Sequence, residues 1–186
     1  LAEAMKDGVR KFGFISPAGT DEGYDAVPLL AAKYKFEQDL RASGLDWVIF
    51  HSGGFYTDLL EMKKLAAKGT LYVIGSGLNR STPVHVADLA RAMFDDMSRV
   101  RNVVVDVGGP EDLTWRDICE MAFTSQGLTP RIAAVPVWLC RVTLALLKPF
   151  TFKYYAMGAL LLWMSTHDVC TPHRGNRRLL DAMREG

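Results

Sequence analysis

The feature that most constrains the fold is residues 33–58, where an amphipathic helix, a short strand and a glycine-rich loop follow one another directly. The helix is predicted to begin near Pro28, a residue suited to a first turn. It is predicted to end at Ser43 and Gly44, because glycine is the usual residue just past a helix end. Its apolar side chains recur at spacings of three and four, which places them on one face: Leu29, Ala32, Phe36 and Leu40.

The strand and the loop after it form the first candidate ligand contact. Residues 45–50 are rich in β-branched and aromatic side chains, which indicates a strand that helices bury on both faces. The chain then breaks at Ser52, Gly53 and Gly54. Ligands of open parallel sheets bind beyond the carboxyl ends of the strands, and glycines there allow backbone to approach a ligand closely. We therefore expect this loop to touch a ligand.

Strands and helices alternate along most of the chain. A polar loop is expected at residues 17–27, and helices are expected at residues 55–68, from Val86 and from Thr114, which can cap its helix. Further strands are predicted at residues 11–16, 70–74, 102–107 and 131–135. This alternation is the pattern of α/β proteins.

The most apolar part of the chain is residues 135–164. Two helices are expected there, on either side of a break at Lys148 and Pro149. Since charged residues interrupt the region, no apolar span approaches the about 20 residues that a membrane helix requires. We expect residues 1–135 to hold the sheet and residues 136–186 to form a small helical lobe. The lobe either packs its apolar surface on the sheet or offers that surface to a large protein partner or to a membrane, as a peripheral contact.

Charge and cysteine content exclude other classes of protein. The 22 Lys and Arg residues balance 21 Asp and Glu residues and are scattered, so no basic surface for nucleic acid is expected. Cys119, Cys140 and Cys170 are widely spaced and lack a CxxC pair, which predicts free, buried thiols in an intracellular, reducing compartment. The histidines show no ligand spacing, so no metal site is predicted.

Several short motifs occur in an order that indicates a family. They are Ser16, Lys33, Glu37, Ser43-Gly44-Leu45, Gly53-Gly54-Phe55, Val84-His85-Val86-Ala87-Asp88-Leu89-Ala90 and Gly108-Gly109-Pro110. Over residues 9–136 the chain resembles the C-terminal two thirds of an atypical short-chain dehydrogenase/reductase, of the NmrA-like or NAD(P)-binding epimerase-like group. This resemblance implies a Rossmann-like parallel sheet flanked by helices, with NAD or NADP lying across the carboxyl ends of the strands.

The resemblance also implies a missing part. In the family the first strand carries a glycine-rich loop that binds the pyrophosphate, and this chain has no such loop. We therefore expect residues 11–16 to be the fifth strand, with four strands and the pyrophosphate site upstream of residue 1. The alternative is that another polypeptide supplies them.

Matching positions give the expected site residues. The resemblance implies catalytic roles for Ser16 and Lys33. In the family a tyrosine four residues before the lysine handles the proton of the substrate, but here that position is Leu29. The nearest phenols are Tyr24, on the preceding loop, and Tyr34, which should point away from Lys33. The expected cofactor contacts are Ser16, Lys33, Gly53, Gly54 and Phe55.

Structural roles compete with several of these functional ones. Ser16 could simply end its strand, and Lys33 could be a surface lysine paired with Glu37, one helical turn away. His51 lies at a strand end, where it serves either as an acid–base group or as a hydrogen-bonded structural histidine. Asp88 is most simply the residue that caps the helix starting at Val86.

Two functions follow from these observations. The first is an NAD(P)-binding protein of the atypical short-chain dehydrogenase/reductase type, acting as an oxidoreductase or as a cofactor sensor without the usual tyrosine. The second is a non-catalytic accessory subunit that keeps the Rossmann scaffold within a larger assembly, such as an organellar membrane complex, and binds it through the apolar residues 135–164. Cytoplasm and organelle are not distinguished by the sequence.

Overall fold

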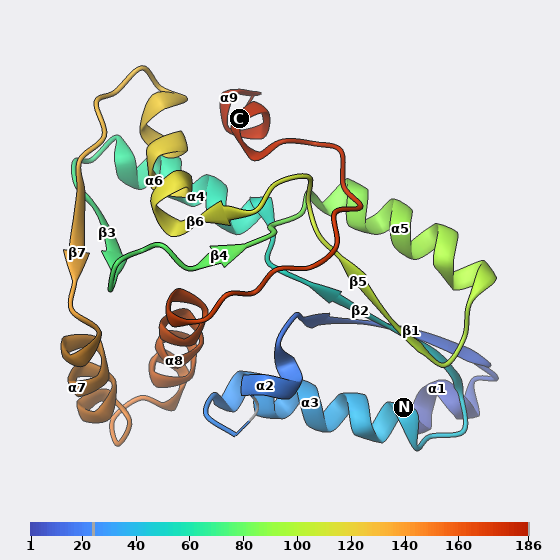
Figure 1. The fold of residues 1–186 in the computed structure, drawn as a ribbon. Coiled ribbons are helices and arrows are strands. Elements are labelled where there is room, and N and C mark those ends of the chain that lie inside the picture. Colours follow the sequence, from blue (N-terminus) through green and yellow to red (C-terminus); the bar gives the residue numbers. More distant parts are fainter. Residues whose placement is uncertain (24, 186) are drawn as a thin grey trace.

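The computed structural model describes residues 1–23 and 25–185 and has an α/β architecture (Figure 1). Its largest sheet contains three parallel strands in the order β1-β2-β5. The strands are β1 (Lys11–Pro17), β2 (Asp46–Ser52) and β5 (Val103–Val107). Parallel pairing requires long crossover connections, which the intervening helices provide.

Helices cover both faces of this sheet (Figure 1). Helix α3 (Pro28–Arg41) lies on one face and α5 (Val86–Arg99) on the other. Side chains alternate along β2, so that Val48 and Phe50 join the apolar cluster under α5 while His51 meets α3. Burial on both faces explains why this strand reads as a continuous apolar run.

A second group of elements packs around its own core. Strand β3 (Leu71–Ile74) pairs in parallel with β7 (Ile132–Val135), and α4 (Tyr56–Ala66) packs against α6 (Trp115–Thr124). As predicted, Thr114 caps α6, through a capping box with Asp117. The fully buried side chains of this core include Tyr56, Ile118, Cys119, Phe123, Leu179 and Met183.

Short elements complete these two groups. Strands β4 (Arg80–Ser81) and β6 (Leu113–Thr114) pair in antiparallel fashion. Helix α1 (Ala2–Lys6) precedes the sheet. Helix α2 (Thr20–Gly23) lies within the segment expected to be only a loop.

The apolar C-terminal region forms the two expected helices. Helices α7 (Val137–Leu147) and α8 (Phe152–Thr166) pack against each other on either side of the predicted break. The last helix, α9 (Leu179–Glu185), packs against α4 and α6. In the described part of the chain, no helix is both long and apolar enough to cross a membrane.

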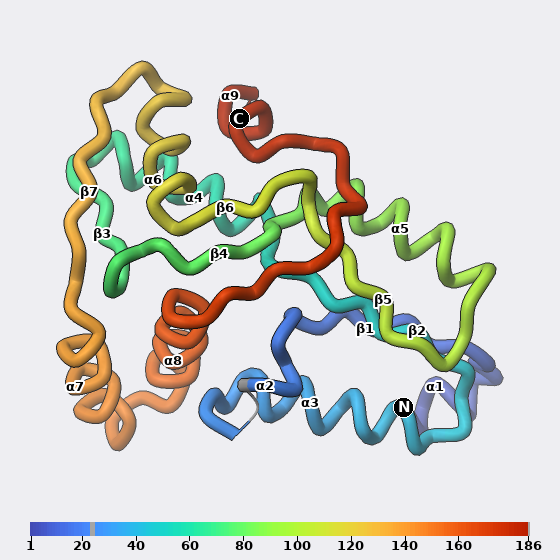
Figure 2. Tube along the Cα trace, in the orientation of Figure 1, coloured from blue at the N-terminus to red at the C-terminus, as the bar shows by residue number. Residues whose placement is uncertain are grey.

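The segment between α8 and α9 crosses the molecule and joins its parts (Figure 2). It forms isolated bridges from Val169 to Ser81 and from His173 to Gly108. Its Thr171 backbone N–H donates a hydrogen bond to Thr82 Oγ1 at 2.6 Å. Segments that are almost ninety residues apart in sequence therefore lie side by side.

Two predictions are only partly right. On the expected apolar face of α3, Leu40 is buried, Leu29 packs against a core cluster and Phe36 packs against Phe14, but Ala32 is exposed. The buried side chains of α3 also include Leu30 and Glu37, which the apolar spacing did not select. All three cysteines are free, but only one of them, Cys119, is buried.

Candidate functional site

A cavity of about 410 Å³ opens at the carboxyl ends of β1 and β2. Its wall includes all five residues that the sequence selected: Ser16, Lys33, Gly53, Gly54 and Phe55. Parallel strands bring these positions together, since the residues that follow neighbouring strands emerge at the same edge of the sheet. The expected site residues therefore share one cavity.

The opposite wall is apolar and was not expected from the sequence. It is formed by Leu160, Trp163 and Met164 of α8 together with Val169 and Leu30. Trp163 belongs to the apolar region that was expected to form the helical lobe; it is buried and also lines the cavity. No local pattern could reveal this wall, because α8 is more than a hundred residues away from β2 in the chain.

Lys33 holds the only cationic side chain among the described lining residues. Its Nζ donates a hydrogen bond to the Ile15 carbonyl oxygen at 3.3 Å and lies 4.7 Å from the centroid of the Phe14 ring. The alternative pairing with Glu37 is wrong, because Glu37 binds His51 and Arg41 instead. The ammonium group is thus held at the end of β1, beside the cavity.

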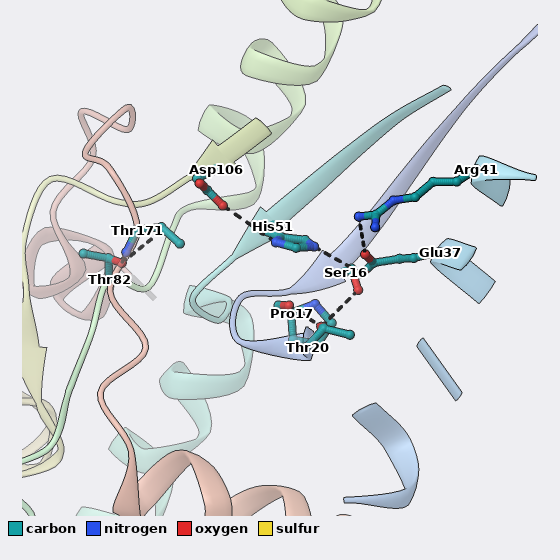
Figure 3. Close-up of polar contacts among 9 residues, drawn as sticks. All are labelled: Ser16, Pro17, Thr20, Glu37, Arg41, His51, Thr82, Asp106 and Thr171. Carbon is teal, nitrogen blue, oxygen red and sulfur yellow. Dashed lines mark hydrogen bonds and ion pairs between the residues drawn. The ribbon is translucent and has the colours of Figure 1, made fainter. Parts of the chain in front are cut away.

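Ser16 is buried, and its hydroxyl is already engaged. Ser16 Oγ lies 3.2 Å from Thr20 Oγ1 at the start of α2, and Thr20 in turn donates to the Pro17 carbonyl oxygen (Figure 3). A bound ligand would have to compete with Thr20 for this hydroxyl. The structure thus provides a strand-end role for Ser16 while leaving it in the cavity wall.

The loop after β2 needs its glycines for two different reasons. A methyl group at Gly53 would lie 2.9 Å from the Thr82 carbonyl oxygen, so this position is closed to side chains. Gly54 has a φ of 137°, which L-residues rarely adopt, and has open space where a side chain would be. The loop is pinned by a hydrogen bond of 2.9 Å from Val84 N–H to the Gly54 carbonyl oxygen.

The position that the family reserves for tyrosine is part of the apolar packing. Leu29 packs against the cluster that contains Val27, Leu30 and Trp163. Tyr34 is half-buried and is not among the described lining residues. Tyr24 lies outside the residues that the structure describes.

A buried polar network lies beneath the site (Figure 3). Glu37, which is only 2% exposed, has its Oε1 3.1 Å from His51 Nε2 and its Oε2 3.3 Å from the Arg41 guanidinium. His51 Nδ1 lies 3.7 Å from Asp106 Oδ1. Both imidazole nitrogens thus face carboxylates, and His51 is absent from the described cavity wall. His51 therefore has the arrangement of a hydrogen-bonded structural histidine, the alternative to an acid–base role.

The partners of Glu37 determine its pKa. Burial, the largest effect, raises the pKa, but hydrogen bonds from His51 and Ser16 together with the charges of His51 and Arg41 outweigh it. The net result is a pKa below the usual range, so the carboxylate stays ionised in the interior. Ser16 thereby connects the cavity wall to this network.

The sequence suggested that Asp88 caps its own helix, and this prediction is wrong. His85 caps α5, because its Nδ1 accepts a hydrogen bond from Ala87 N–H at 3.1 Å. Asp88 Oδ2 instead accepts 2.9 Å hydrogen bonds from the backbone N–H groups of Asn176 and Arg177, and the Arg177 side chain pairs with Oδ1. Burial raises the pKa of Asp88, but these contacts outweigh it and lower the pKa. Asp88 therefore anchors the C-terminal segment.

Comparisons with known proteins find similar solved structures but no similar sequence family. No protein-family profile and no curated protein sequence matches the chain. Among solved structures, the Escherichia coli NADPH-dependent quinone oxidoreductase QOR2 complexed with NADPH has a TM-score of 0.72 at 16% identity, over 99% of this chain and 68% of that one. AtPrR2 with NADP+ and (+)pinoresinol has a TM-score of 0.74 at 14% identity, over 99% and 67%.

A second type of structure is also similar. The Thermus thermophilus UDP-glucose 4-epimerase in complex with NAD has a TM-score of 0.59 at 21% identity, over 73% of this chain and 54% of the epimerase. The chain thus spans between about half and about two thirds of the length of these three structures. It has the Rossmann-like α/β fold of epimerases and reductases, as the resemblance to the atypical short-chain dehydrogenase/reductases implied.

Proposed function

We propose that the chain is the nicotinamide-side part of an NAD(P)-binding protein of the atypical short-chain dehydrogenase/reductase type. The observation that carries this proposal is the convergence of Ser16, Lys33, Gly53, Gly54 and Phe55 on one cavity at the carboxyl ends of two parallel strands. Structures of the same fold that hold NAD, NADPH or NADP+ support it. The proposal is that this chain binds the same class of dinucleotide.

The residues present fit one end of a dinucleotide. A volume of about 410 Å³ is at the small end of ligand pockets, which span roughly 300–1,000 Å³, so the cavity suits one ring and its ribose rather than a whole dinucleotide. Gly54 leaves open space for close approach, and Lys33 supplies a cation for ribose or phosphate oxygens. When bound, the cofactor would supply hydride chemistry, while this chain would orient the ring.

The apolar wall indicates what would lie beside the ring. Leu160, Trp163 and Met164 offer a surface that excludes water, which favours an apolar compound over a sugar or a phosphate. Among the described lining residues, the side chains that can donate a hydrogen bond are Lys33, Ser16, Ser52 and Trp163, and none of them carries a phenol or an imidazole. This composition supports either reduction without a tyrosine or cofactor sensing.

Cofactor titration tests the proposal. NADPH and NADH are each added to the purified protein while tryptophan fluorescence is followed, because Trp163 lines the cavity. Lys33→Met is expected to weaken binding about tenfold or more, the usual effect of losing a charge-assisted hydrogen bond. Lys35→Met, on the exposed side of the same helix, is the matched control and should bind as the unaltered protein does. Absence of binding at ~1 mM of either cofactor would refute the proposal.

The second candidate is a non-catalytic accessory subunit that keeps the scaffold. It is favoured by Leu29, which fills the tyrosine position with a packed apolar side chain. Purification from the native source separates the two: a free, catalytically active monomer or dimer excludes an accessory role, whereas a stable assembly without oxidoreductase activity supports it. A Leu29→Tyr variant that gains reductase activity would show that the absent hydroxyl is the limiting defect.

A further inference from the structure

The α7–α8 hairpin, residues 136–166, exposes large apolar side chains along both helices and at the connecting loop. Phe150 and Phe152, in and just after the loop, are 82% and 66% exposed. On α7, Trp138, Val142 and Leu146 recur every four residues and are all exposed, so they form one stripe. Exposed apolar area of this extent marks an interaction surface rather than ordinary protein surface.

The hairpin is a defined structure whose apolar stripe faces outward. Its two helices approach closely at Gly158, where an added methyl group would lie 2.4 Å from Leu144 Cδ2. Leu144 lies on the opposite side of α7 from the exposed stripe. Helix α7 has no buried residue, so its outer stripe has no partner in the described part of the chain.

Charge distinguishes the kind of partner. Residues 136–166 contain Arg141, Lys148 and Lys153 and not one of the 21 Asp and Glu residues of the chain. The hairpin therefore carries a local charge of +3, although the whole chain is at +1. An apolar surface fringed only by cations complements a surface that is apolar within and anionic at its boundary.

A second cavity lies beside the hairpin and, like the hairpin surface, combines apolar side chains with cations. It has a volume of about 410 Å³ and is lined by Arg141 and Lys148 together with apolar side chains such as Leu162 and Trp163. None of the described lining residues is acidic. Lys148 Nζ lies 5.4 Å from the centroid of the Tyr155 ring, which holds the cation near the cavity. The arrangement suits an anionic group attached to an acyl chain.

We propose that the α7–α8 hairpin docks the protein on an anionic lipid surface. The helices lie in the plane of the interface, Phe150 and Phe152 insert among the acyl chains, and Arg141 and Lys148 bind headgroup phosphates. The helices are too short to span a bilayer, which agrees with in-plane binding. A protein partner would need the same apolar face rimmed with carboxylates, and the test below separates it from lipid.

Vesicle co-sedimentation of the whole chain tests the proposal. The protein is expected to bind vesicles of phosphatidylcholine mixed with phosphatidylserine and to bind pure phosphatidylcholine vesicles much less. A Phe150→Ser/Phe152→Ser variant should lose most of its binding. Phe94→Ser is the matched control, because Phe94 is 83% exposed on α5, outside the hairpin, and should bind unchanged.

The electrostatic part has its own variants. Replacing Lys148 and Lys153 by Gln should lower binding to the anionic vesicles on the order of thirtyfold, since each cation near such a surface contributes ~1 kcal/mol. The control replaces Lys64 and Lys68, exposed on and just after α4, by Gln. Failure to bind either vesicle, equal binding to both vesicles, or equal losses in the hairpin and control variants would each overturn the proposal. So would a soluble dimer or protein complex that forms through the hairpin in the absence of vesicle binding.

Discussion

The β1-β2 region and the α7–α8 hairpin distribute polar and apolar groups in opposite ways. Beneath the sheet, Glu37 is buried and ionised, held by His51 and Arg41. In the hairpin the cations are on the surface, and so are large apolar side chains such as Phe150. The difference indicates which contacts stabilise the fold. Internal contacts stabilise the sheet region, whereas the outer side chains of the hairpin contribute little and remain free for binding.

The largest effect should come from one substitution made in both regions. Leu40→Ala, at a side chain with 0% exposure on α3, is expected to lower the free energy of unfolding by about 2–5 kcal/mol. Leu146→Ala, at a side chain with 66% exposure on α7, should change it by less than ~0.5 kcal/mol. Urea unfolding followed by circular dichroism measures both. Equal losses would show that the hairpin is part of the core and would break the comparison.

The contact between the two regions should respond next. Gly19, just after β1, has a φ of 74°, and a methyl group there would lie 2.6 Å from the Trp163 ring of α8. Gly19→Ala combines left-handed backbone strain with this clash and is expected to cost about 2–3 kcal/mol. Gly8→Ala has a similar φ of 78° but no neighbour within 4 Å, so it should cost only ~1 kcal/mol. If the same unfolding measurement gives equal costs, the packing of Trp163 against Gly19 is not tight.

The buried charge gives a smaller effect that depends on pH. Glu37→Gln removes an ionised partner from His51 and Arg41 and is expected to cost about 1–3 kcal/mol at pH 7. Because the folded-state pKa of Glu37 lies below its ordinary value of 4.5, its stabilising contribution is present above pH 4.5 and is lost as pH falls through the folded pKa. The difference between the two proteins should therefore shrink below pH 4.5.

Unfolding by urea at pH 7, 5 and 3.5 follows this difference. Asp39→Asn is the control, because Asp39 is an exposed carboxylate on the same helix that pairs only at the surface with Lys35. Its effect should stay below ~1 kcal/mol at every pH. A Glu37→Gln variant whose deficit grows toward low pH would contradict the lowered pKa.

The smallest effect should come from the tip of the hairpin. Phe150→Ser/Phe152→Ser is expected to change the free energy of unfolding in solution by less than ~0.5 kcal/mol, because both rings are largely in water. Thermal unfolding without vesicles checks this. A large loss would mean that the rings pack in the folded protein, and that reduced vesicle binding by this variant reflects unfolding.

The sequence predicted the helices and strands better than it predicted the buried helix faces and the residues that line the cavity. The helix from Pro28 and the strand near residues 45–50 followed from local periodicity and β-propensity, and both are confirmed. The role of Asp88 depends on Asn176 and Arg177, almost ninety residues later, which no local pattern can reveal. By contrast, the sequence could predict that the residues following two neighbouring parallel strands lie close together, because an α/β fold places the carboxyl ends of these strands at one edge of the sheet.

The crossing segment between α8 and α9 has a consequence for synthesis on the ribosome. Val169 pairs with β4, His173 bridges to Gly108, and Met183 is fully buried against α4 and α6. A chain grows from its N-terminus at roughly 5–20 residues per second, so the earlier strands emerge well before these partners exist. The protein therefore cannot complete its native packing until residues 168–183 have left the exit tunnel, and until then nascent chains expose both Asp88 and the core around Tyr56 to chaperones.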